Sequence, residues 1–109
     1  QARDIVWPAF PHNAELATGD AAMLRFGVNL TQTLAKRFGV PAPTVLSTRD
    51  VPGMPRAALP ILRKAGVRAL SEGMNGRMVP VNVPPAFLWQ SLDTQSTMPV
   101  FWHWHGYGE

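Results

Sequence analysis

The sequence contains no cysteine among its 109 residues, which excludes a disulfide framework and a thiolate metal site. It contains no apolar run near the roughly 20 residues that a membrane-spanning helix needs, so we expect no membrane partner. Neither a signal-peptide pattern nor a starting methionine opens the chain. We therefore expect a soluble piece of a longer polypeptide, either cytoplasmic or exported.

Charged residues are also sparse, at 16% of the chain, although the formal net charge is +3 and the pI about 10.2. The Lys and Arg residues are scattered, and no basic stripe with interleaved aromatic residues occurs, so we expect no nucleic-acid partner. A G-x-S-x-G motif, a Walker loop and a dinucleotide fingerprint are absent too, which removes several common enzyme classes. The apolar fraction of 46% suffices for a packed core.

Strand and helix patterns alternate along the chain, which predicts an α/β fold with a parallel sheet and crossover helices. A closed (β/α) barrel needs roughly 200 residues or more. We therefore expect residues 1–109 to be a single partial domain of a larger barrel, with flanking segments of the same chain as its neighbours. The expected elements are strands at 4–7, 45–48, 67–72 and 98–104, and helices at 21–38 and 55–65.

Three features qualify this pattern. The helix at 21–38 has strong end signals, with Asp20 as its N-cap and Gly39 just past its end. The helix at 55–65 contains Pro60, which predicts a kink or a loose first turn. The segment 73–85 is rich in Gly, Asn and Pro and is expected to be irregular, and the aromatic run at 84–89 is expected to dock without forming a regular strand.

Asp50 lies in the hexapeptide T-R-D-V-P-G at 48–53, where a strand pattern breaks sharply. Catalytic groups collect at the carboxyl ends of parallel strands, which makes Asp50 a candidate catalytic carboxylate. The alternative structural interpretation is that it opens a turn or caps the following helix, as Asp often does. Position alone leaves both interpretations open.

Other polar residues follow the expected strands, and their convergence on one rim would form a site. Of these, His103 and His105 alternate with tryptophans, so in a strand both imidazoles would face the same way and, with Asp50, resemble a zinc ligand set. The alternative is a pair of rim histidines between core tryptophans. Trp104 is a candidate for stacking on a sugar ring. The polar residues at the strand ends are His12, Asn13 and Glu15, then Arg49 and Asp50, then Glu72, Asn75 and Arg77, and finally His103 and His105.

The segment S-T-R-D-V-P-G at 47–53, followed by a helix that ends L-R-K-A-G-V at 62–67 and by a strand, resembles the nucleophile segment of glycoside hydrolase family 38. That family comprises the retaining zinc-dependent α-mannosidases. The loop P-H-N-A-E at 11–15 and the long helix after it also look like the family's preceding unit. The closest likeness is to domain of unknown function family 5054, in which D-V-P-G and a downstream Gly-Tyr-Gly region recur. The resemblance covers nearly the whole chain and implies a (β/α) barrel of the glycoside hydrolase or deacetylase type.

This resemblance implies that Asp50 both ligates zinc and attacks the anomeric carbon of a carbohydrate substrate in a retaining mechanism. The family's other zinc ligands and its acid/base carboxylate lie on strands that this sequence does not contain, so the isolated chain is expected to be inactive. The residues that would line the substrate pocket are His12, Asn13, Glu15 and Arg49.

Two other functions remain open. One is a non-catalytic carbohydrate-binding relative of the same barrel. The other is a metal-dependent polysaccharide deacetylase that uses Asp50, His103 and His105. Met54 stands where the mannosidases usually have His, which leaves the identity of the sugar open.

Overall fold

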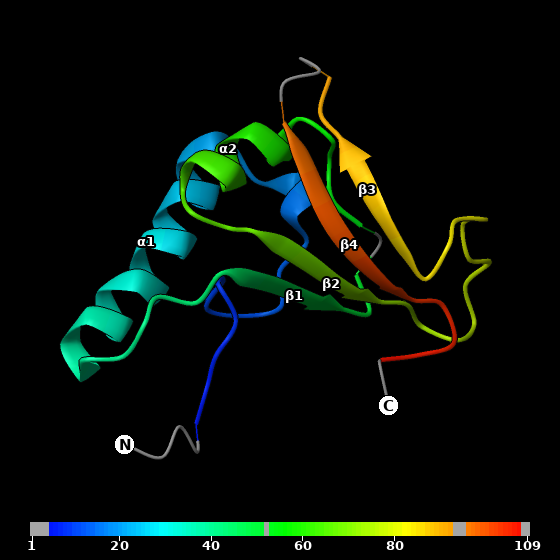
Figure 1. The fold of residues 1–109 in the computed structure, drawn as a ribbon. Coiled ribbons are helices and arrows are strands. Elements are labelled where there is room, and N and C mark those ends of the chain that lie inside the picture. Colours follow the sequence, from blue (N-terminus) through cyan, green and yellow to red (C-terminus); the bar gives the residue numbers. More distant parts are fainter. Residues whose placement is uncertain (1–4, 52, 93–95, 108–109) are drawn as a thin grey trace.

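A four-stranded sheet lies against two helices in the computed structural model, which describes residues 5–51, 53–92 and 96–107 (Figure 1). The elements are a short 3-10 helix η1 (Leu16–Thr18), α1 (Ala21–Phe38), β1 (Val45–Arg49), α2 (Ala58–Lys64), β2 (Ala69–Gly73), β3 (Ala86–Gln90) and β4 (Thr97–His103). The strand order is β1-β2-β4-β3, with β1, β2 and β4 parallel and β3 antiparallel to β4. The chain is a mixed α/β domain with an open, mostly parallel sheet, and its described residues form no barrel.

Helix α1 has the bounds that its sequence predicts, because both of its ends carry local signals. The Asp20 carboxylate accepts a hydrogen bond from the Met23 N–H at 2.8 Å, as an N-cap does. Gly39 follows the last turn with φ 64°, and its N–H donates to the carbonyls of Ala35 and Lys36. The predicted helix and both of its end signals are confirmed.

Helix α2 is shorter than predicted, because it begins at Ala58 and ends at Lys64. Pro60 therefore falls in the first turn, where a backbone N–H has no partner within the helix. Its missing donor costs no helical hydrogen bond there. Of the two predicted outcomes, a kink or a loose first turn, the structure has the second: residues 56–57 form a turn, and the Ala58 N–H donates to the Pro55 carbonyl at 2.9 Å. Gly66, just past the end, has φ 96° as a helix-terminating glycine does.

The strand predictions need two corrections. Residues 5–7 form no strand, and Asp4 lies outside the described residues. Pro8 has no N–H to donate, and Ala9 instead makes a single bond to the Val45 carbonyl at 2.7 Å. The aromatic run expected to be irregular contains the regular strand β3, which pairs with β4 from Ala86 to Gln90. The irregular segment before it, predicted at 73–85, contains no regular element beyond the last residue of β2.

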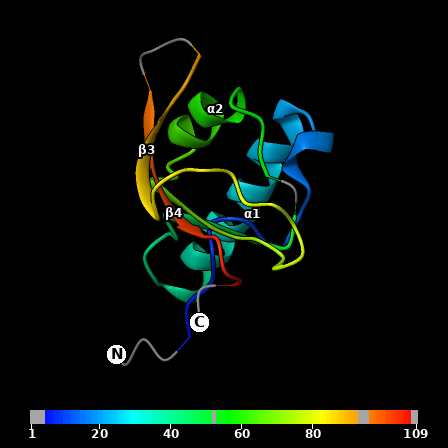
Figure 2. The ribbon, with the colours of Figure 1, turned by 90° about the vertical axis from the view of Figure 1, so that its right-hand side faces the viewer.

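Both helices lie on one side of the sheet (Figures 1 and 2). On that side, alternate strand residues are buried and pack against α1 and α2. On the opposite side, which we call the open face, Val45, Phe101 and Leu88 remain 42%, 52% and 69% exposed. The sheet is thus covered on one face only. The buried core includes Leu46, Leu70, Met98 and Val100 from the strands, Leu59 and Leu62 from α2, and Leu24 and Val28 from α1.

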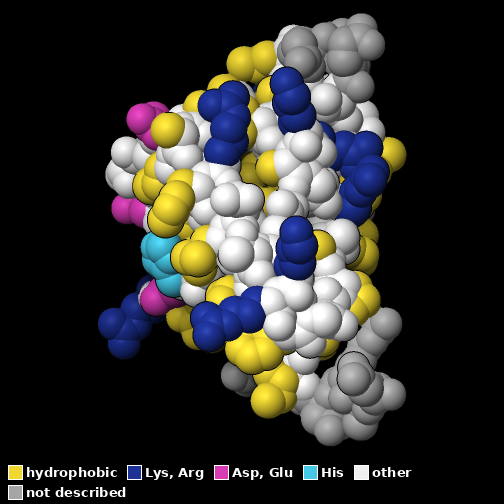
Figure 3. All heavy atoms as spheres, turned by 90° about the vertical axis from the view of Figure 1, so that its left-hand side faces the viewer, with side chains coloured by type: hydrophobic (Ala, Val, Ile, Leu, Met, Phe, Trp, Pro, Cys, Tyr) yellow, Lys and Arg dark blue, Asp and Glu magenta, His cyan; other side chains and the backbone are white. Residues whose placement is uncertain are grey.

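The outer surface around α1 carries Lys and Arg side chains as separate groups among uncharged residues, with no continuous basic strip in this view (Figure 3). Neither helix in the described part of the chain combines the length and the apolar character needed to cross a bilayer.

Gly27 lets the N-terminal loop pack onto α1, because the fully buried ring of Phe10 occupies the space where a Cβ would lie. We expect Gly27→Ala to lower the free energy of unfolding by about 1–3 kcal/mol through overpacking, although alanine favours helix by about 1 kcal/mol over glycine. Urea denaturation measures the change. Gly76→Ala is the matched control, since a Cβ there meets nothing within 4 Å. A Gly27→Ala protein as stable as the control would contradict this packing.

Candidate active site

Asp50 follows directly after β1, at the carboxyl end of the parallel strands, and its side chain is exposed. Its backbone has φ 63°, and it is the one non-glycine residue with a positive φ among those described. Its N–H donates to the Gly73 carbonyl at 2.9 Å, which extends the pairing of β1 with β2 by one residue. Asp50 does not cap the next helix, because the N-cap position of α2 is Ala57. The carboxylate is therefore presented at the strand end, in a backbone conformation that Asp tolerates better than most residues.

Tyr107 is the neighbour of Asp50 in space. Partial desolvation of the phenol, and then the charge of the Asp50 carboxylate and a side-chain hydrogen bond with it, raise the pKa of Tyr107 above its ordinary value of 10.0. The segment after β4 thus returns to the end of β1 and brings a phenol to the candidate nucleophile.

The Arg49 side chain holds the segment after β4 at the end of β1. Its Nε donates to the Tyr107 carbonyl at 2.8 Å, and its Nη1 donates to the carbonyls of Thr48 and Ser71 at 2.7 and 2.8 Å. Its Nη2 donates to the Ser71 hydroxyl at 3.0 Å. These bonds occupy four of the five N–H groups of the guanidinium. Arg49, a predicted substrate-binding residue, is therefore chiefly a positioning residue for Tyr107 and Asp50.

Gly73 makes room for this arrangement at the end of β2. A Cβ on Gly73 would lie 2.7 Å from both Arg49 Cδ and the Gly106 carbonyl oxygen, and 2.9 Å from Tyr107 Cα. Two of these three atoms belong to backbone, which cannot move aside as a flexible side chain can. The absence of a side chain at this position is what allows the final segment to lie over the strand.

The loop that carries the other predicted substrate residues reaches the same end of the sheet. The Asn13 side chain pairs with the backbone of Arg49: its Oδ1 accepts from the Arg49 N–H at 2.9 Å and its Nδ2 donates to the Arg49 carbonyl. Asn13 thus imitates a neighbouring strand at the edge of β1. His12 is exposed, with its ring centroid 5.5 Å from that of Phe10, and Glu15 is exposed at the N-cap of η1.

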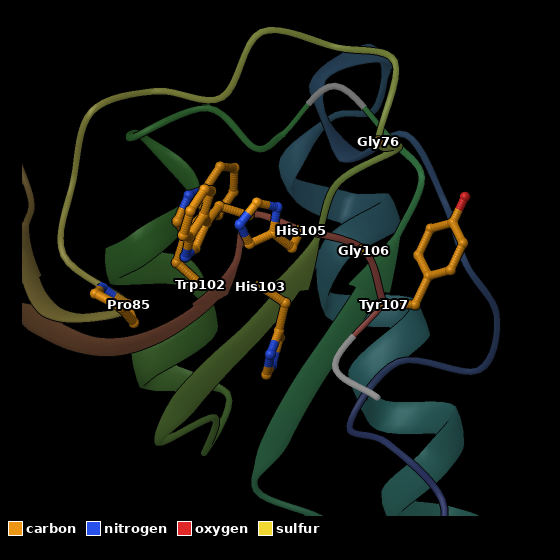
Figure 4. Close-up of a pocket in the computed structure, with 8 residues that line it drawn as sticks. Gly76, Pro85, Trp102, His103, His105, Gly106 and Tyr107 are labelled. Carbon is orange, nitrogen blue, oxygen red and sulfur yellow. The ribbon is translucent and has the colours of Figure 1, made fainter.

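The two C-terminal histidines do not share a face, which corrects the geometry predicted for them. Strand β4 ends at His103, so strict alternation does not extend to His105. The Nε2 of His103 lies 3.1 Å from the Ser71 hydroxyl, whereas the ring of His105 stacks on Trp104 with centroids 3.4 Å apart. Figure 4 shows the two imidazoles pointing in opposite directions.

Among residues 5–51, 53–92 and 96–107, no three His, Asp or Glu side chains gather into a group that could hold a metal ion. Asp50, His103 and His105 therefore do not assemble into the zinc ligand set that their sequence pattern predicted. The described residues alone do not fit a complete zinc site.

A hollow of about 580 Å³ opens beside this region and is mostly aromatic in character (Figure 4). The Trp102 and His105 rings stand on one side of it and Tyr107 on the other. Trp104, predicted to stack on sugar, also lines the hollow and is 45% exposed. Sequence reasoning identified neither Trp102 nor Tyr107 as a site residue. The predictions for His103, Trp104 and His105 pointed to this segment, and the Gly-Tyr-Gly of the resembled family pointed to its end.

Glu72 is a buried acid on the helix-covered face of β2. It is 9% exposed, and its Oε1 has no hydrogen-bond partner among the described residues. Burial raises the pKa of Glu72, and the positive charge of Arg49 lowers it by a smaller amount. Trp102, its partner across the strands, likewise has a buried indole N–H without a described partner.

Comparisons with protein-family models, with curated proteins and with solved structures find no match for this chain. The resemblance to glycoside hydrolase family 38 therefore remains a prediction from the sequence motifs.

The pairing of Asp50 with Tyr107 can be measured directly, because Tyr107 is the single tyrosine in the sequence. We expect tyrosinate absorbance to report a pKa above the ordinary value, and Asp50→Asn to lower that pKa by removing a negative charge beside the phenol.

Asp20→Asn is the matched control, since asparagine also caps helices well and Asp20 does not act on the Tyr107 phenol. An equal titration midpoint in the Asp50→Asn and Asp20→Asn proteins would show that Asp50 and Tyr107 are not neighbours.

Proposed function

We propose that this chain supplies the nucleophile and part of the sugar-binding wall of a zinc-dependent, α-mannosidase-like glycoside hydrolase. One observation carries the proposal: the exposed Asp50 carboxylate stands at the carboxyl end of β1 beside Tyr107, which also lines the aromatic hollow. A retaining glycosidase uses two carboxyl groups, one of them as the nucleophile, and Asp50 would be that nucleophile.

The barrel is part of this proposal, and the open face supports it. Parallel sheets almost always have both faces covered, yet here Val45 and Phe101 are about half exposed on the face without helices. In a barrel this face would point to the inside, and further strands of a longer polypeptide would close the sheet around it. The helices α1 and α2 already cover the face that would be the outside.

The hollow provides surfaces suited to a sugar ring. Indoles present flat apolar faces to sugar C–H groups and a polar N–H at their edge. Trp104 combines an exposed indole with a stacked His105, so that aromatic and hydrogen-bonding groups occur on the same wall. We propose that carbohydrate binds there.

In the proposed reaction, a carboxylate oxygen of Asp50 forms a bond to the anomeric carbon while the glycosidic C–O bond breaks. A general acid from outside the described residues protonates the leaving oxygen, and water then hydrolyses the glycosyl ester. Asp50 would also be a zinc ligand, and the remaining ligands would come from elsewhere in the longer polypeptide. The positive φ and the Gly73 bond hold Asp50 in place for this attack.

A second candidate is a carbohydrate-binding relative without catalysis. The aromatic hollow favours it, because that wall needs no contribution from Asp50. The deacetylase alternative requires two imidazoles turned toward one metal ion, and the opposite directions of His103 and His105 give it no support.

Activity of the full-length protein on a panel of aryl glycosides tests the catalytic role of Asp50. We expect Asp50→Ala to lower kcat/KM by more than about 10³-fold, because the covalent intermediate can no longer form. Azide should restore turnover and give a glycosyl azide of inverted configuration, since a small anion can enter the space that the carboxylate leaves.

Asp20→Asn, which alters a distant carboxylate, should leave turnover unchanged. Unaltered kcat/KM in Asp50→Ala would overturn the catalytic proposal. Binding of the sugar without turnover in any variant, the unsubstituted protein included, would establish the binding relative instead.

A further inference from the structure

Ser71 and His103 form a hydrogen-bonded pair on the open face, and His103 also lines the aromatic hollow. They stand on adjacent parallel strands, β2 and β4, near the carboxyl ends where catalytic groups collect. Ser71 Oγ lies 3.1 Å from His103 Nε2, within the range in which a histidine removes the proton of a serine nucleophile. Both side chains are half-buried. We propose that Ser71 is an acyl-accepting serine, activated by His103, that reacts with small carboxylic esters.

Arg49 sets the direction of one hydrogen bond at Ser71, and the tautomer of His103 sets the direction of the other. A guanidinium only donates, so the Ser71 hydroxyl accepts from Arg49 Nη2 at 3.0 Å. With a neutral imidazole that carries its proton on Nδ1, the Ser71 O–H donates to His103 Nε2. The hydroxyl proton then points at the base that must remove it, and the cation beside Oγ stabilises the negative charge that develops there.

Arg49 also supplies a donor for the oxyanion. Four of its five N–H groups are bonded within the described residues, and the fifth is the second N–H of the same Nη2. An ester carbonyl attacked by Ser71 Oγ would place its oxygen close to that N–H. Electrostatic stabilisation of this kind is usually the largest single contribution to acyl transfer.

The space next to Ser71 suits an acyl group. Ser71 and Ser47 line a hollow of about 470 Å³ on the open face, and most of its remaining lining is apolar. A short apolar acyl chain would bury there against Trp7 and Val45, which leaves the ester carbonyl near the hydroxyl. The apolar lining is formed by Val6, Trp7, Pro8, Pro43 and Val45.

The proposed reaction balances without a metal or a redox partner. Ser71 Oγ bonds to the ester carbonyl carbon as its proton moves to His103 Nε2. The tetrahedral intermediate collapses, the ester C–O bond breaks, and the leaving alcohol takes the proton from His103. Water then attacks the acyl-serine with His103 as base, which releases the carboxylic acid and regenerates the hydroxyl.

Incubation of the full-length protein with p-nitrophenyl acetate tests the proposal, with intact-mass analysis and peptide mapping to locate the acetyl group. We expect Ser71 to be acetylated in the unsubstituted chain and the label at this position to disappear in Ser71→Ala. We expect His103→Gln, which keeps a hydrogen-bonding group beside the hydroxyl, to slow acetylation of Ser71 by about 10²-fold or more.

Ser96→Ala is the matched control, because Ser96 immediately precedes β4, at the opposite end of that strand from His103, and lines neither hollow. It has no hydrogen bond to an imidazole in the described structure, so its replacement should leave the rate unchanged. Circular dichroism and the Tyr107 titration verify that each variant is folded.

Two results would overturn the proposal: neither an acetyl group on Ser71 nor a release of p-nitrophenolate that depends on Ser71, or an equal rate of Ser71 acetylation in His103→Gln. Neither result bears on the glycoside hydrolase proposal, which depends on Asp50 and on a different substrate.

Discussion

The guanidinium of Arg49 holds the carboxyl end of the sheet together, because four of its N–H groups donate to β1, β2 and the segment after β4. Three of these acceptors are backbone carbonyls, which the end of a parallel sheet leaves available. Charge-assisted bonds of this kind are stronger than neutral ones. Everything proposed for the site depends on them, since they bring Tyr107 to Asp50 and orient the Ser71 hydroxyl.

Elements with local signals could be predicted from the sequence, and elements that depend on distant pairing could not. Helix α1 carries its own cap residues and has the predicted bounds. Strand β3 carries no such signal, because its regularity comes from antiparallel pairing with β4, which the alternation of parallel units did not predict. Pro60 could be interpreted only once the first turn of α2 was located.

In the candidate site, too, the features with a local sequence signal could be predicted and those that depend on distant contacts could not. The position of Asp50 at a strand end followed from the break at Val51-Pro52-Gly53, whose middle residue lies outside the described part. The roles of Asn13 and Arg49 did not follow, because their polar groups bond to backbone that is distant in sequence. The histidine pair failed for a more local reason: the strand ends at His103, two residues before His105, so alternation does not reach it.

The buried carboxyl group of Glu72 couples folding to the binding of a proton. Because burial raises the pKa of Glu72 above its ordinary value of 4.5, the folded chain binds a proton more tightly than the unfolded chain does. The resulting stabilisation is complete below that ordinary value and is lost as the pH rises through the folded-state pKa. Mild acidity thus favours assembly of the sheet, the reverse of the usual behaviour of carboxylates that unfold proteins in acid.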